Sequence, residues 1–327
     1  MKVLVTGGAG FIGSHLCEAL LKSDHQITVL DDFSTGSRGN LAHLKGDQRL
    51  RVVEGDVRHA SAFHGLPAPE MIFHLAAGVG VRTILDKPLH SLETNLRGTE
   101  NVLHVATAWG SPVVVASTSE VYGKNDGGAL SEDSDRLLGA GEVARWWYAI
   151  AKMADEALAL AYHREDRLQA LVVRFFNTVG PRQTGRYGMV VPTLVRQALA
   201  GEPLTVYGDG EQTRCFTYVE DAVRALIALA QNRSAYGRIY NIGQPSEISI
   251  NQLAKRIIEL TNSSSDIVHV PYSEAYGDSY EDMRRRVPDC TRLGETIGWT
   301  PSNRLDEAIT VLAESLRKDA QHLCEPA

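Results

Sequence analysis

Short apolar runs alternate with longer amphipathic segments through roughly the first half of the chain. The runs are rich in Val, Ile and Leu, as is typical of strands that are buried on both faces. The segments between them have the length and spacing of helices, notably residues 14–21, 91–108 and 145–163. Regular alternation of this kind predicts an α/β fold with a doubly wound parallel sheet. The expected strands are residues 2–6, 26–30, 50–54, 71–75, 112–116 and 169–176.

The pattern changes after Asn177. Residues 177–188 are rich in glycine and basic side chains, which is typical of a loop. Residues 220–230 and 238–242 have the pattern of a helix and a strand that return to the sheet. We therefore expect two interleaved domains, the second of which is smaller and discontinuous. The expected domains are residues 1–176 with about 215–243, and residues 177–214 with 244–327.

Composition limits the possible partners and compartments. The chain has 327 residues, a hydrophobic fraction of 43% and a net charge of -7, which argues against a general nucleic-acid or membrane-surface binder. No apolar segment approaches the roughly 20 residues that span a bilayer, and the amino terminus does not resemble a signal peptide. The four cysteines are scattered without a CxxC pair. We therefore expect a cytoplasmic protein that holds no structural metal.

Three glycines follow the first expected strand directly. Gly7, Gly10 and Gly13 lie between this strand and a helix, with Phe11 and Ile12 inside the motif. Glycine at these positions permits a tight turn and a close approach of the backbone to a pyrophosphate, which the helix amino terminus also attracts. This context predicts a dinucleotide site on a Rossmann sheet.

The ends of the next strands supply further cofactor candidates. Asp31 and Asp32 follow the second strand, where a carboxylate binds the ribose hydroxyls and repels a 2′-phosphate, so we expect NAD rather than NADP. We interpret His74 as a packed core histidine, and Asn95 either organises the active site or is satisfied within its helix. The remaining candidates are Asp56 and Val57, beside the adenine, and Leu75, Ala76 and Ala77, against the cofactor.

The candidate chemistry lies between Ser117 and Lys152. The segment Thr118-Ser119-Glu120 follows a buried strand, so its side chains emerge where open parallel sheets bind ligands. Tyr148 and Lys152 are four residues apart and share one face of a helix. A neighbouring ammonium group favours the phenolate, so we expect a lowered pKa for Tyr148. Such a phenolate would be a base that takes a proton from a sugar hydroxyl.

These motifs together resemble the extended short-chain dehydrogenase/reductase family, and more narrowly its nucleotide-sugar epimerases, dehydratases and decarboxylases. The resemblance covers nearly the whole chain, from the glycines and YxxxK to FNxxGP, TRCF and RVPD. It implies that Thr118, Tyr148 and Lys152 form the catalytic triad, which oxidises the sugar at C4 with NAD. The substrate residues that it implies are Asn177, Arg182, Arg186, Val191, Tyr207, Arg214, Tyr280 and Arg286.

Two residues separate the possible reactions. Dehydratases of this family carry Asp-Glu where this chain has Ser119-Glu120, and a serine hydroxyl cannot act as their acid. The motifs STSEVYG, RWxY and YGxxYxDxxxR resemble UDP-glucuronate decarboxylases, in which the C4 ketone makes the C5 carboxylate a β-keto acid. The resemblance assigns Ser119 and Glu120 to the C5 region. Arg182 and Arg186 would pair with a carboxylate or face phosphate or solvent.

Two other functions stay open, as does the assembly. A UDP-sugar 4-epimerase, acting on UDP-glucuronate or UDP-glucose, needs the same triad, although Glu120 stands where such enzymes have a small or neutral residue. An NAD-sensing protein without catalysis would have no use for a base. The resemblance also implies a homodimer through a four-helix bundle from residues 91–108 and 145–163. Apolar Val102, Val105, Ala149, Met153 and Leu160 fit this seam, although internal packing explains them as well.

Overall fold

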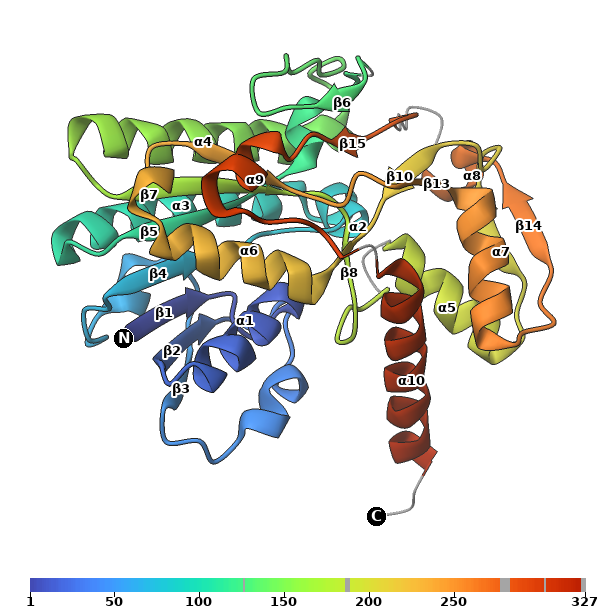
Figure 1. The fold of residues 1–327 in the computed structure, drawn as a ribbon, viewed down its shortest axis with the longest axis horizontal. Coiled ribbons are helices and arrows are strands. Elements are labelled where there is room, and N and C mark those ends of the chain that lie inside the picture. The colour runs from blue at the N-terminus through green and yellow to red at the C-terminus, as the bar shows by residue number, and fades with distance from the viewer. Residues whose placement is uncertain (126, 186–188, 277–282, 303, 325–327) are drawn as a thin grey trace.

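A seven-stranded, all-parallel sheet forms the centre of the larger lobe (Figure 1). The computed structural model describes residues 1–125, 127–185, 189–276, 283–302 and 304–324. The strand order β12-β7-β5-β4-β1-β2-β3 shows that the chain starts inside the sheet and winds to both edges, which confirms the predicted α/β class. The strands are β1 (Lys2–Thr6), β2 (Gln26–Asp31), β3 (Leu50–Glu54), β4 (Met71–His74), β5 (Val113–Thr118), β7 (Ala170–Phe175) and β12 (Ile239–Ile242).

Helices cover both faces of this sheet. They are α1 (Phe11–Lys22), α3 (Pro88–Trp109), α4 (Trp147–Glu165) and α6 (Val219–Gln231). Side chains alternate across a strand, so Val3 and Val5 enter the core beneath α1 and α6, while Leu4 enters the core beneath α3 and α4. Because both faces are covered, the inner strands are continuously apolar, as the sequence pattern predicts.

The smaller lobe lies to the right in Figure 1. Helix α7 (Ile250–Thr261) begins at a capping box in which Ser249 and Gln252 satisfy each other's backbone N–H groups. It packs on α5 (Val190–Ala200) and α10 (Leu305–Cys324). The other elements here are α8 (Tyr272–Tyr276), β9 (Leu204–Tyr207) paired with β14 (Ile267–Val270), and β10 (Thr213–Cys215) paired with β13 (Glu247–Ser249).

Short elements connect the two lobes. Strand β8 (Thr178–Val179) pairs with β11 (Thr217–Tyr218), and β6 (Ala129–Leu130) pairs with β15 (Val287–Pro288). Strand β12 and helix α6 belong to the large sheet as expected, and the exact division into two domains stays a prediction. The remaining elements are α2 (Val81–Asp86), α9 (Thr291–Ile297), η1 (Arg38–Leu44), η2 (Ala60–Phe63), η3 (Ser119–Tyr122), η4 (Ala144–Trp146) and η5 (Arg233–Ala235).

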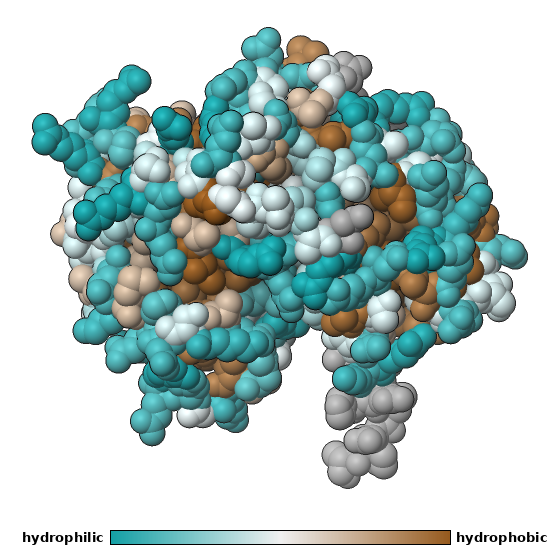
Figure 2. Space-filling view, viewed as in Figure 1, coloured by the Kyte–Doolittle hydropathy of each residue, from teal (hydrophilic) through white to brown (hydrophobic). Residues whose placement is uncertain are grey.

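The outer surface is mostly polar. Figure 2 shows hydrophilic side chains over most of the visible face, with apolar side chains in scattered small groups. Within the described part of the chain, no helix combines the length and the apolar character needed to cross a membrane.

Candidate active site

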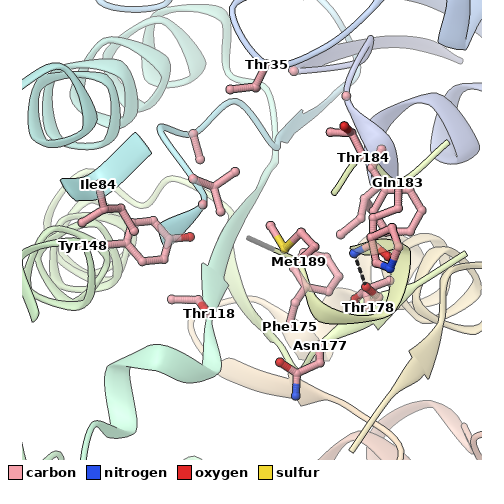
Figure 3. Close-up of a pocket in the computed structure, with 18 of the residues that line it drawn as sticks. Thr35, Ile84, Thr118, Tyr148, Phe175, Asn177, Thr178, Gln183, Thr184 and Met189 are labelled. Atoms are coloured by element: carbon pink, nitrogen blue, oxygen red, sulfur yellow. Dashed lines mark hydrogen bonds between the residues drawn. The ribbon is translucent and has the colours of Figure 1, made fainter. Parts of the chain in front are cut away.

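A cleft of about 940 Å³ opens where the sheet strands end, between the two lobes. The strand order reverses between β1 and β4, and open α/β sheets bind ligands in the crevice at such a reversal. In Figure 3, Thr118 and Tyr148 lie on one side of this cleft, and Asn177 and Met189 lie on the other. The cleft therefore brings the sheet-end residues together with residues of the smaller lobe.

The turn after β1 fits a dinucleotide. Gly7 has a φ of +72°, and a Cβ atom there would lie 2.6 Å from the backbone nitrogen of Ala76. A Cβ atom on Gly13 would lie 2.2 Å from the carbonyl oxygen of Gly7. Only glycine allows both approaches, and the amino terminus of α1 then faces the cleft. All five motif residues predicted for cofactor binding line the cleft, namely Gly7, Gly10, Phe11, Ile12 and Gly13.

The two aspartates after β2 also line the cleft. Asp31 is buried and accepts hydrogen bonds from the backbone N–H groups of Ala9 and Phe33, both at 2.8 Å. Burial raises its pKa, and these two N–H groups act against that rise. Asp31, at the end of β2, thus holds the glycine-rich turn in place through its hydrogen bond from Ala9. Asp32 instead accepts hydrogen bonds from the backbone N–H and hydroxyl of Ser34 at the cleft wall.

Two predicted cofactor residues do not line the cleft. The Asp56 carboxylate is bound by the guanidinium of Arg58 at 2.6 Å and does not line the cleft, whereas its neighbour Val57 does. Asn95 is fully buried and donates to the carbonyl oxygens of Ser91, at 2.8 Å, and Gly78, at 3.4 Å. Its amide nitrogen is therefore bound by its own helix and by the loop before it, whereas its Oδ1 has no hydrogen-bond partner among the described residues, so both interpretations of Asn95 stay predictions. Leu75, Ala76 and Ala77 all line the cleft as expected.

The predicted catalytic residues do come together. Thr118 ends β5, Tyr148 and Lys152 lie on successive turns of α4, and all three line the cleft. Figure 3 shows the Tyr148 ring directed into the cleft on the same side as Thr118. The Thr118 side chain acts to lower the pKa of the Tyr148 phenol. This is the arrangement expected of a base with a hydroxyl neighbour.

The expected lowering of the Tyr148 pKa is not found. Burial raises the pKa of this phenol, and the charges of Glu120 and Asp155 raise it further. The Thr118 side chain and the charge of Arg145 act in the opposite direction but do not outweigh them. Lys152 is bound instead to Asp155, with 2.8 Å between Nζ and Oδ2, so a second carboxylate balances its charge. The prediction from spacing overlooked this partner.

Glu120 lies between two arginines. Its carboxylate forms ion pairs with Arg145 and with Arg286, the latter at 2.5 Å. Burial opposes ionisation of Glu120, but the two guanidinium groups outweigh it and lower the pKa to about 2. Arg286 also donates to Asn177 at 2.6 Å. Glu120 and both arginines line the cleft. Because this cluster contains two guanidinium groups and one carboxylate, its net charge is positive. Arg145 belongs to the RWxY motif but received no role from the sequence.

The predicted substrate residues divide into three groups. Asn177, Val191, Tyr207, Arg214 and Arg286 line the cleft. Arg182 also lines it, but its guanidinium binds Glu18 at 2.8 Å and His15 at 2.7 Å, which ties its loop to α1 instead of leaving it for a carboxylate. Arg186 and Tyr280 lie outside the described residues. Reasoning from sequence missed Gln212 and Tyr272, which also line the cleft and have no motif to mark them.

The fold and the site together define a class of protein. A doubly wound sheet with a dinucleotide turn, and a Thr-Tyr-Lys set at its carboxyl edge, define an NAD-dependent enzyme of the extended short-chain dehydrogenase/reductase type. The chain belongs to the NAD dependent epimerase/dehydratase family, whose model matches residues 3–243. The resemblance stated from the sequence is confirmed, and NAD is the cofactor of the family.

Individual relatives extend this assignment. The chain is 45% identical over 303 residues to UDP-N-acetyl-alpha-D-glucosaminuronate decarboxylase of Bacillus cytotoxicus, covering 92% of this chain and 93% of that protein. It is 36% identical to UDP-glucuronic acid decarboxylase 1 of Xenopus tropicalis, covering 98% and 73%. Among solved structures, UDP-glucuronic acid 4-epimerase of Bacillus cereus, with UDP-glucuronic acid and NAD, matches with a TM-score of 0.86 at 28% identity, covering 97% and 99%.

Proposed function

We propose that this protein is a UDP-hexuronate decarboxylase that oxidises the sugar at C4 and then releases the C5 carboxylate as CO₂. The observation that carries the proposal is the cluster of Arg145, Glu120 and Arg286, which lines the same cleft as Tyr148. Its net positive charge suits a substrate that is itself acidic, because a guanidinium binds a carboxylate through two parallel hydrogen bonds. A neutral hexose would leave that charge uncompensated in a buried site.

Tyr148 begins the proposed reaction. It takes the proton of the C4 hydroxyl while the C4 hydrogen leaves as hydride, and Thr118 holds the phenol oxygen in place. NAD⁺, when bound, would supply the hydride acceptor and a positive charge that favours the phenolate. The glycine turn, Asp31 and Asp32 would hold the cofactor. Asn177 and Arg214 would lie along the diphosphate of the substrate.

Loss of CO₂ follows from the new ketone. The C5–carboxyl bond breaks, its electron pair passes into an enolate over C5 and C4, and a proton from solvent then adds to C5. Ser119 is buried beside Glu120 and lines the cleft, so both can contact the C5 region. With a pKa of about 2, Glu120 is ionised and does not supply that proton. Its proposed role is to orient the two arginines.

The two candidate substrates differ in the substituent at C2 of the sugar. Our expectation from the sequence is UDP-glucuronate, as for the Xenopus tropicalis relative. The higher identity to the Bacillus cytotoxicus enzyme favours UDP-N-acetylglucosaminuronate, whose C2 carries an acetamido group. Both substrates present the same C4 hydroxyl and C5 carboxylate to Tyr148 and the arginine cluster. We therefore propose the shared chemistry for both and favour the acetamido sugar on identity.

A substrate panel tests this proposal. Purified protein and NAD⁺ are incubated separately with UDP-N-acetylglucosaminuronate, UDP-glucuronate and UDP-glucose, with CO₂ release and nucleotide-sugar products measured. We expect CO₂ from at least one uronate, a tenfold or greater preference in kcat/KM between the two, and no product from UDP-glucose. Formation of the C4 epimer without CO₂ would instead support an epimerase. An absence of turnover with every UDP-sugar would favour an NAD-sensing protein.

We also propose that the protein is a cytoplasmic homodimer joined through α3 and α4. These helices pack together. Leu89 of α3 and Ile150 of α4 are apolar side chains that are nevertheless 68% and 44% exposed. Of the five apolar residues expected in the seam, Val102 and Ala149 are buried within the chain, whereas Val105, Met153 and Leu160 are partly exposed. Sedimentation should give twice the mass of one chain, and Ile150→Glu should shift the protein towards monomer. A monomeric wild-type protein would contradict the proposal.

A further inference from the structure

A buried ion pair lies on the side of Lys152 away from the cleft. Lys152 Nζ and Asp155 Oδ2 are 2.8 Å apart, and their side chains are only 2% and 0% exposed. They lie three residues apart on α4, so the helix itself holds them together. Lys152 lines the cleft, but Asp155 does not. Asp155 is therefore a charged residue in the core that reaches the cleft only through Lys152.

A short chain of hydrogen bonds runs beside this pair into the sheet. Burial raises the pKa of Asp155, Lys152 and Thr99 of α3 act against that rise, and Asp155 Oδ1 has no hydrogen-bond partner among the described residues. His74 Nε2 lies 3.1 Å from the Thr99 hydroxyl, and His74 Nδ1 lies 2.7 Å from the hydroxyl of Thr6. Thr6 and His74 end the two strands beside the dinucleotide turn. The chain therefore runs from the floor of the cofactor site to Thr99, whose side chain acts on Asp155.

The ring of His74 joins the two threonine hydroxyls. Burial, followed by the charge of Lys152, lowers the pKa of His74 to about 3, so the ring is neutral and has one N–H donor and one acceptor nitrogen. One ring nitrogen therefore donates and the other accepts, between the hydroxyls of Thr6 and Thr99. The predicted core histidine thus links Thr99 of α3 to the sheet beside the ion pair.

Charged groups from several elements face Tyr148. Lys152 and Asp155 come from its own helix, Glu120 from η3, and Arg145 from η4. Arg286 reaches this set through its ion pair with Glu120. The positive charges of Arg145 and Arg286 exceed the negative charge of Glu120, and the charge of Asp155 balances that of Lys152. Removing only the Asp155 charge would leave the lysine charge uncompensated within the same buried set.

We propose that Asp155 is a positioning residue for the catalytic pair: it holds Lys152 through the buried ion pair, balances its charge, and thereby sets the strength of Tyr148 as a base. Lys152 alone would favour the phenolate strongly, and Asp155 moderates this effect so that Tyr148 both takes up and returns a proton. The i,i+3 spacing on α4 keeps the carboxylate beside the ammonium group. The inference rests on the proposed role of Tyr148 in the reaction.

An absorbance titration of cofactor-free protein tests the inference without relying on activity. Tyrosinate absorbance is recorded between about pH 8 and 11 for the wild type and for Asp155→Asn, and the signal of the same protein with Tyr148→Phe is subtracted. We expect little Tyr148 phenolate in the wild type over this range. In Asp155→Asn the phenolate should appear at a pH lower by about one unit or more. Superimposable titrations would overturn the inference.

The pH dependence of sugar oxidation supplies the second readout. The acid limb of kcat/KM should move to lower pH by about one unit in Asp155→Asn. Glu156→Gln is the matched control, because Glu156 is the adjacent buried acid of α4 but binds Arg174 and Ser117. It should lower stability without moving the limb. Equal movement in both variants would overturn the inference.

A conservative variant covers the case in which Asp155→Asn does not fold. Thr99→Val keeps the volume of the side chain and removes the hydroxyl that acts on Asp155. It should move the titration in the same direction by a smaller amount, and an unmoved titration would overturn the inference. If the wild type turns over no UDP-sugar, the proposed function fails, whereas the absorbance titration still decides the role of Asp155.

Discussion

Tyr148→Phe should reduce sugar oxidation by about 10²- to 10⁴-fold, the range that general-base catalysis contributes. The variant keeps the buried aromatic ring in the first turn of α4 and removes only the phenol hydroxyl. Without it, the described catalytic set contains no group positioned to take the C4 proton. NADH formation in a single turnover measures this step directly. NAD affinity, measured by calorimetry, should change little because the glycine turn is untouched.

Tyr236→Phe is the matched control for this prediction. Its hydroxyl donates to the carbonyl oxygen of Ala230 at 2.7 Å, and the residue does not line the cleft. The control should therefore retain full activity and lose at most a little stability. Sugar oxidation in Tyr148→Phe within about tenfold of the wild type would show that another group acts as the base.

The fold and the cofactor turn were predictable because their signals are local. Gly7 needs a positive φ, and Gly13 must approach the turn closely, so the sequence shows the constraint directly. Tyr148 and Lys152 were placed correctly because helical spacing alone puts them on one face. The apolar runs predicted the strands for the same reason, since each is buried on both faces.

The partner of each charged side chain is what the sequence did not show. Arg182 was expected at the substrate, but Glu18, which is distant in sequence, binds its guanidinium across the folded chain. Asp56 was expected at the adenine, but Arg58, two residues away, binds it. Asp155 received no role from the sequence, and the fold buries it beside Lys152. In each case a competing partner decided where the charge lies.

Glu120→Gln should slow CO₂ release by about 10²-fold while slowing hydride transfer by less than about tenfold. An amide keeps the shape of the side chain but removes the charge that Arg145 and Arg286 share. The two guanidinium groups would then bind the substrate carboxylate more strongly. Stabilising the carboxylate before CO₂ leaves raises the barrier, because that charge moves into the enolate in the transition state.

Two measurements separate the steps. Substrate labelled with deuterium at C4 reports hydride transfer, and substrate labelled in the carboxyl group reports CO₂ release. Glu247→Gln is the matched control, since Glu247 also binds an arginine, Arg285, but does not line the cleft. It should leave both rates unchanged. Equal loss of both rates in Glu120→Gln would remove the reason for assigning Glu120 to the later step.

The pH dependence of this variant adds a further check. The pKa of Glu120 is depressed from 4.5 to about 2, so its ion pairs are fully present above about pH 4.5 and are lost only as the pH falls towards 2. The ratio of CO₂ release between wild type and Glu120→Gln should therefore be constant from about pH 6 to 9. Hydride transfer should instead respond in the acid limb, because removing the Glu120 charge lowers the pKa of Tyr148. A constant ratio for CO₂ release with a shifted limb for hydride transfer would identify Glu120 as an ionised partner of the arginines and not as a proton donor.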